Sequence, residues 1–101
     1  MMLIYITCKD EEEARKISMH LVKNRLAACT NMFPIRSFYW WKDKIEETDE
    51  YVVLAKTIDE NYEKIKKEVK KIHSYEVPCI MKMNVDVNEE YGKWVEKETK
   101  Q

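Results

Sequence analysis

The chain has 101 residues, so residues 1–101 are expected to form a single domain around one hydrophobic core. Eighteen basic and nineteen acidic side chains give a net charge of −1, which provides no bulk positive field for nucleic acid or anionic membranes. No apolar run approaches the roughly 18 residues of a membrane span, and residues 1–7 lack the cationic start and the length of a signal peptide, so a cytoplasmic protein is expected.

The first elements are a strand and a helix. Residues 2–8 are nearly all apolar, which is typical of a strand buried on both faces in the middle of a sheet. Asp10, followed three residues later by Glu13, resembles a capping box at the start of a helix. An apolar face with helical spacing continues from there, and we expect the helix to end near residues 24–26.

A long hairpin is predicted next. Residues 28–41 have an extended pattern, interrupted by Pro34, which cannot donate to a ladder and belongs at an edge or a bulge. Residues 42–44 form the turn, where Asp43 can adopt the left-handed backbone conformation. The return strand starts with a polar half and ends with an apolar half, so its first half is expected to project beyond the domain body.

The second half of the chain predicts a helix, a strand and a short terminal helix. Thr57 and Glu60 can form a second capping box, and residues 58–72 carry apolar side chains at spacings of four, three, four and three. Residues 79–85 form the last predicted strand, and Asn88 is expected to cap the terminal helix. This order of elements predicts an α+β fold: a ferredoxin-like βαββαβ antiparallel sheet with an extra C-terminal helix. Both main helices are expected on one face of the sheet.

Four consecutive aromatic residues, Phe38, Tyr39, Trp40 and Trp41, stand before the turn of the hairpin. Neighbouring side chains on a strand point to opposite faces, so Trp40 and Trp41 cannot share one core. One of these faces therefore needs a second covering layer, because large aromatic rings are too apolar to leave exposed on a small monomer. We predict that another subunit supplies it.

The cysteines and the general composition add two expectations. Cys8, Cys29 and Cys79 are an odd number without a C-x-x-C spacing, which argues against a disulfide framework and against a structural zinc site. Charged residues make up 37% of the chain and there is a single glycine, a balance typical of proteins that resist heat. We therefore expect free thiols and a thermostable protein.

Five short motifs with matching spacing resemble the CutA family, the divalent-cation tolerance proteins. The resemblance covers essentially the whole chain, and the motifs are Arg-Leu-Ala-Ala-Cys-Thr-Asn at 25–31, Phe-Tyr-Trp-Trp at 38–41 with Lys-Ile-Glu at 44–46, Leu-Ala-Lys-Thr at 54–57, His-Ser-Tyr-Glu-Val-Pro at 73–78 and Tyr-Gly-Lys-Trp at 91–94. Three positions depart from the family pattern: Ser74 replaces a usual proline, Asp43 a usual glycine in the turn, and Gly92 a usual apolar residue.

The resemblance implies a cytoplasmic homotrimer of ferredoxin-like subunits, similar in architecture to PII signalling proteins, with the long hairpins paired between subunits. It also implies a link to copper and other divalent ions, and no catalytic activity. Phe38, Tyr39, Trp40 and Trp41 would then lie at the trimer interface.

His73 is the first candidate metal ligand. It stands at the end of the second predicted helix, close to Glu76, so an imidazole and a carboxylate could bind copper(II) or another divalent cation. The thiol of Cys29, at a position of the family motif, could complete the site from a neighbouring subunit. The structural alternatives are a histidine stabilised by the helix dipole and a small buried cysteine. Cys8 is not assigned to the site, because the family's occasional thiol falls at the position of Ile6.

A second kind of site is suggested by Asn31, Lys56 and Tyr75, which stand at motif positions. They could bind an anionic small molecule in clefts between subunits, or they could make structural hydrogen bonds. Two functions follow: a non-enzymatic homotrimer that binds divalent metal, or a PII-like sensor or scaffold that binds a small ligand. An RNA-recognition module is excluded because its K/R-G-F/Y signature is absent, and a hydrolase because no nucleophile elbow, phosphate loop or HExxH is present.

Overall fold

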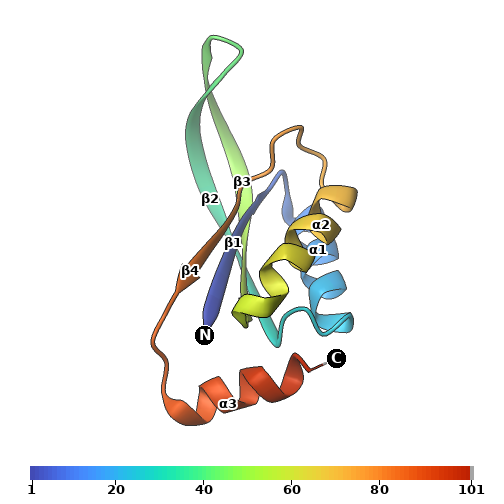
Figure 1. Ribbon diagram of the computed structural model, residues 1–101. Helices are drawn as coiled ribbons and strands as arrows, with labels where there is room; N and C mark the ends of the chain where they lie inside the picture. The colour runs from blue at the N-terminus through green and yellow to red at the C-terminus, as the bar shows by residue number, and fades with distance from the viewer. Residues whose placement is uncertain (101) are drawn as a thin grey trace.

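The structure, a computed structural model, describes residues 1–100. Its elements in chain order are β1 (Met2–Cys8), α1 (Glu11–Lys23), β2 (Cys29–Trp41), β3 (Lys44–Thr57), a 3-10 turn (Asp59–Asn61), α2 (Tyr62–Ile72), β4 (Ile80–Asn84) and α3 (Glu89–Glu98). The strands form one antiparallel sheet in the order β2-β3-β1-β4, which confirms the predicted α+β, ferredoxin-like arrangement. Figure 1 shows α1 and α2 on one face of the sheet and α3 across the end where β1 begins.

The core lies between the sheet and the two main helices. Alternate residues of β1, namely Ile4, Ile6 and Cys8, are fully buried against α1 and α2. The side chains between them are only partly buried. The expectation that residues 2–8 are buried on both faces is therefore wrong for a single chain, because the face opposite the helices lacks a complete cover.

The start of α1 confirms the predicted cap in part. The Asp10 side chain accepts a hydrogen bond from the Glu13 amide at 2.9 Å, as an N-cap residue should. The Glu13 carboxylate accepts from the amide of Lys9 instead of Asp10, so the reciprocal bond of a capping box is displaced by one residue.

The second predicted capping box is wrong. The Thr57 hydroxyl is buried and donates a hydrogen bond to the carbonyl of Leu26, in the loop after α1, at 2.6 Å. The side-chain amide of Asn61 donates to the same carbonyl at 3.2 Å. Because these groups bind the loop, the chain makes a 3-10 turn first and α2 starts at Tyr62. Asn88 likewise precedes α3 without a capping bond from its side chain.

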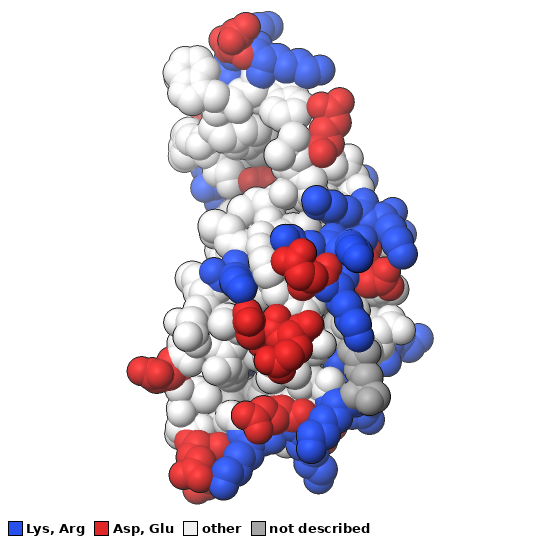
Figure 2. Space-filling view, viewed as in Figure 1, with Lys and Arg blue, Asp and Glu red and all other residues white. Residues whose placement is uncertain are grey.

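The β2–β3 hairpin ends in a two-residue turn. Lys42 and Asp43 have φ values of 48° and 64°, so both adopt the left-handed conformation that suits the twist of a two-residue hairpin. The hairpin projects beyond the helices, as predicted (Figure 1). Phe38 is 67% and Trp40 72% exposed. Figure 2 shows uncharged surface over the hairpin below its charged tip.

The helices of this fold are short. None of those within residues 1–100 has both the length and the apolar character that a membrane crossing requires.

Candidate functional site

Two groups of side chains meet at the end of the sheet where β1 finishes and the hairpin leaves the domain body. One is a buried polar cluster beneath residues 73–79, the segment that joins α2 to β4. The other is a cavity between this segment and the hairpin.

His73 is the C-cap residue of α2, and its side chain is fully buried. The Tyr75 amide donates to Nδ1 at 3.1 Å, so Nδ1 is an acceptor. Nε2 lies 2.7 Å from the carbonyl oxygen of Thr7 and therefore carries the proton that it donates. Both ring nitrogens are engaged, and the bonds define a neutral imidazole with its proton on Nε2.

Glu13 lies beside this imidazole. Its Oε1 accepts from the Lys9 amide and its Oε2 from the Ser74 amide, each at 3.0 Å, and Oε1 is 3.9 Å from His73 Nε2. Burial raises the pKa of the Glu13 carboxyl, but the hydrogen bonds from Lys9 and Ser74 outweigh burial and leave the pKa lowered. Glu13 is thus a buried carboxylate that joins the start of α1 to the segment after α2.

Cys8 completes the cluster from the end of β1. One ligand atom each from Cys8, Glu13 and His73 lie within 4.8 Å of one another. Burial, followed by the negative charges of Glu13, Glu50 and Asp10, raises the pKa of the Cys8 thiol to about 12. The thiol is therefore protonated at neutral pH, and any metal must displace its proton.

Sequence reasoning missed Cys8 and Glu13 as neighbours of His73. The signal that could have found Glu13 is its place in the capping sequence. The first turn of a helix that directly follows a central strand lies at the end of that strand. The segment after α2 crosses the same end, so the Glu13 side chain can reach it. Spacing alone did not show that His73 would turn inward there.

Cys29 is not near His73 within one chain. It lies at the start of β2 opposite Lys56, which pairs with Leu3 of β1. Leu3 is four residues away from Thr7, which His73 contacts, and this separation is about 13 Å along the strand. A site that combines His73 with Cys29 therefore requires a neighbouring subunit and stays a prediction.

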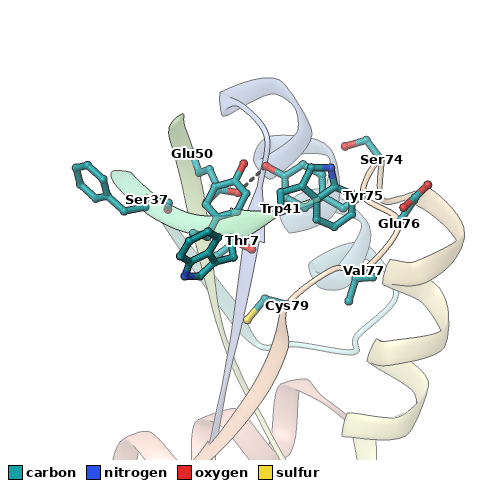
Figure 3. A pocket seen from close by; sticks show the side chains of 12 residues that line it. Thr7, Ser37, Trp41, Glu50, Ser74, Tyr75, Glu76, Val77 and Cys79 are labelled. Carbon is teal, nitrogen blue, oxygen red and sulfur yellow. Dashed lines mark hydrogen bonds between the residues drawn. The ribbon is translucent and has the colours of Figure 1, made fainter. Parts of the chain in front are cut away.

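The cavity has a volume of about 710 Å³ (Figure 3). It contains the four aromatic residues predicted for the interface, together with Glu76 and Tyr75, and its lining residues are Thr7, Ser37, Phe38, Tyr39, Trp40, Trp41, Glu50, Ser74, Tyr75, Glu76, Val77 and Cys79. The other two residues predicted for a ligand cleft, Asn31 and Lys56, lie elsewhere. Asn31 lies near the start of β2 and Lys56 near the end of β3, at the end of these strands that is away from the cavity. The Nζ of Lys56 is 5.3 Å from the centroid of the Tyr91 ring.

Glu50 is the most buried charged group of the cavity, with 7% of its surface exposed. The Tyr75 hydroxyl donates to its Oε2 at 2.5 Å, as the dashed line in Figure 3 indicates. Burial and the bond to Glu50 raise the pKa of the Tyr75 phenol. The phenol therefore stays protonated and serves as a neutral donor to the carboxylate.

Comparisons with known proteins agree over the whole chain. A family model described as CutA1 divalent ion tolerance protein matches residues 2–98. The divalent-cation tolerance protein CutA of Pyrococcus horikoshii is 45% identical over 101 residues, covering 99% of both chains. The crystal structure of CutA1 from the same organism superposes with a TM-score of 0.95 at 43% identity and full coverage of both chains. A PII-like protein CutA from Nostoc, solved in apo form, has a TM-score of 0.92 at 27% identity, covering 99% of this chain and 98% of the other.

Proposed function

Because the chain belongs to the CutA1 divalent ion tolerance protein family, we propose that it is a non-enzymatic protein that binds divalent metal ions and acts in the response to them. The observation that supports a metal site in this chain is the cluster of Cys8, Glu13 and His73, whose ligand atoms lie within 4.8 Å of one another.

The donor set suits copper or zinc. Imidazole nitrogen, thiolate sulfur and carboxylate oxygen bind these borderline ions, whereas magnesium prefers oxygen ligands only. Two changes must accompany binding: the Cys8 thiol loses its proton, and one nitrogen of His73 exchanges its backbone hydrogen bond for the metal. Binding should therefore strengthen as the pH rises, with copper held more tightly than zinc and magnesium hardly at all.

The experiment is a titration of the chelator-treated protein with copper(II) or zinc, read by calorimetry and by metal content after gel filtration. Cys8→Ala and His73→Ala should each reduce the stoichiometry from one ion per chain toward zero. Cys79→Ala is the matched control, since it removes another free thiol outside the cluster. Binding by Cys8→Ala that equals the parent's would exclude this cluster, and binding that depends on Cys29 would favour the intersubunit alternative.

We further propose that the protein assembles as a homotrimer through its hairpins. The chain exposes 6804 Å², whereas a compact monomer of 12.3 kDa would expose about 6,100 Å². Large apolar side chains of the projecting hairpin are exposed, among them Phe38, Trp40 and Ile45. Threefold pairing of hairpins would cover them and remove exposed strand edges, with interfaces on the order of 2,000 Å² or more. A monomer in light scattering at micromolar concentration would contradict this proposal.

A second candidate function is a PII-like sensor or scaffold that binds a small ligand. The cavity of about 710 Å³ favours it, because this volume falls in the range of small-molecule sites. Native mass spectrometry of gently purified protein would test it by detecting a retained small molecule, and the same spectrum would give the number of subunits.

We also propose a cytoplasmic location. A solved relative from Archaeoglobus fulgidus is described as periplasmic, so the location needs its own measurement. Cell fractionation with cytoplasmic and membrane markers would provide it.

A further inference from the structure

The buried carboxylate of Glu13 is held by two segments of the chain. Its Oε1 accepts a hydrogen bond from the amide of Lys9, directly after β1, and its Oε2 accepts one from the amide of Ser74, in the segment after α2, each at 3.0 Å. The Ser74 hydroxyl also hydrogen-bonds to this carboxylate. An ionised carboxylate has about four acceptor positions, so the group is fixed in place and can still bind an ion.

The carboxylate faces the other two groups of the polar cluster. Glu13 Oε1 lies 3.9 Å from His73 Nε2, and one ligand atom each from Cys8, Glu13 and His73 lie within 4.8 Å of one another. A tetrahedral zinc ion with bonds of about 2.0 to 2.3 Å places its ligands about 3.3 to 3.8 Å apart, so these groups need to approach one another by roughly 1 Å. All three groups belong to one chain, and no neighbouring subunit is needed to complete the set.

The charge of the cluster matches that of a divalent ion. With Cys8 as a thiolate and Glu13 as a carboxylate, two negative charges lie beside the neutral imidazole of His73. A divalent ion makes this buried site neutral, whereas a monovalent ion leaves one negative charge uncompensated and away from water, which is costly. Without Glu13, the thiolate and the imidazole would suit the soft monovalent ion copper(I). Glu13 is therefore the group that discriminates between ions of different charge.

We propose that Ser74 is a positioning residue that makes this cluster selective for divalent over monovalent metal ions, because it holds Glu13 as the second negative ligand beside Cys8. The inference rests on the proposed metal-binding function and deepens it, since it names the class of ion and the residue that sets it. Proline, the usual residue at position 74 in the family motif, has neither an N–H nor a hydroxyl and could make neither bond.

The backbone allows Ser74 to be tested by one substitution. His73, which precedes it, has φ −83° and ψ 141°, the extended conformation that a residue before proline prefers. Ser74 itself has a negative φ, as proline requires. Ser74→Pro should therefore remove both hydrogen bonds to Glu13 with little strain in the segment after α2.

The first experiment is a zinc titration of chelator-treated protein with reduced thiols, against a chromophoric competitor. Ser74→Pro should bind zinc at least about tenfold more weakly than the parent, the loss typical of a residue that orients a metal ligand. Ser74→Ala keeps the amide and removes the hydroxyl, so its loss should be smaller. Should Ser74→Pro fail to fold, Ser74→Ala and Glu13→Gln carry the test. Zinc binding by the folded Ser74 variants that equals the parent's would overturn the proposal.

Titrations with copper(I) in the absence of oxygen separate positioning from general damage. In Ser74→Pro and Glu13→Gln the copper(I) affinity should stay within about threefold of the parent's, because the thiolate and the imidazole remain. The zinc affinity should fall at least about tenfold in both variants. Glu12→Gln, an exposed glutamate of the same helical turn, should bind both ions as the parent does. Equal losses for zinc and copper(I) would overturn the proposal, because they would show that the substitutions disturb the whole cluster.

The parent distinguishes this inference from the proposed function. Zinc binding that depends on Cys8 and His73 but is the same in the parent, Ser74→Pro and Glu13→Gln would overturn the inference and leave the proposed function intact. A parent that binds neither zinc nor copper would overturn both.

Discussion

The side chain of His73 shows what residue spacing can and cannot predict. Its place at the end of a helix followed from the apolar periodicity of residues 58–72. Its contacts did not, because they depend on how the next segment crosses the end of β1. The structure turns the imidazole inward to Thr7 and Glu13. Glu76, close in sequence, lines the cavity instead.

The lowered pKa of Glu13 makes a prediction about acid stability. The folded state binds this proton less readily than the unfolded chain does, so the contribution of Glu13 is present above the unfolded pKa, near 4.5, and is lost as the pH falls through the folded value. Urea titrations from pH 7 to pH 3 should show the parent losing more stability than Glu13→Gln. At pH 7 the variant should be less stable by about 1 to 3 kcal/mol.

Glu12→Gln provides the control, since Glu12 is the exposed neighbour in the same turn. It should follow the parent across the whole pH range. If Glu13→Gln and the parent lose stability in parallel below pH 5, the Glu13 carboxylate does not stabilise the fold.

Among the elements, the types and the order of strands and helices were predictable because each carries a clear apolar period. Their ends were harder to predict. Thr57 and Glu60 have the spacing of a capping box, but the Thr57 hydroxyl binds the distant Leu26 carbonyl, so a tertiary contact overrides a local signal. The turn was predictable in position, and Asp43 in conformation, although Lys42 is left-handed as well.

The apolar stripe of α2 predicts a large contrast between two substitutions in one turn. Ile65 is fully buried beneath the helix, so Ile65→Ala should reduce the free energy of unfolding by about 2 to 5 kcal/mol. Lys67 is on the exposed face, and Lys67→Ala should change the free energy of unfolding by no more than about 0.5 kcal/mol. Denaturant titrations of both variants would measure this. Effects of equal size would mean that the helix packs with a different face.

At the scale of the whole molecule, the chain is more extended than its length requires. Its radius of gyration is 14.0 Å, against about 12.7 Å for a compact domain of this size. The projecting hairpin accounts for the difference (Figure 1). The sequence predicted that this hairpin needs a second layer, but one chain cannot show which surface supplies it.

Trp40 should therefore matter more for assembly than for the fold of a single chain. Its ring is 72% exposed in the isolated chain, so Trp40→Ala should leave the subunit folded. If a neighbouring subunit buries the ring, the substitution should weaken the trimer by about 3 to 5 kcal/mol. Sedimentation equilibrium would show dissociation at a higher concentration than in the parent.

Met19→Ala is the matched comparison, because Met19 is also an exposed apolar residue, 56% accessible, on α1 away from the hairpin. It should leave the association unchanged. An equally stable trimer in Trp40→Ala would place the indole outside the interface.

One hydrogen bond, from the Tyr75 amide to His73 Nδ1, connects the polar cluster to the cavity. A metal bound to Nδ1 would break this hydrogen bond and free the backbone of Tyr75, whose hydroxyl donates to Glu50. Metal binding and the Tyr75–Glu50 hydrogen bond would then be thermodynamically linked: an ion in the cluster would weaken this hydrogen bond, and the hydrogen bond would weaken metal binding by the same factor. Copper titrations of the parent and of Tyr75→Phe, which lacks the hydroxyl, would measure this linkage. Equal copper affinities in the two titrations would show that the cluster and the Tyr75–Glu50 pair are energetically independent.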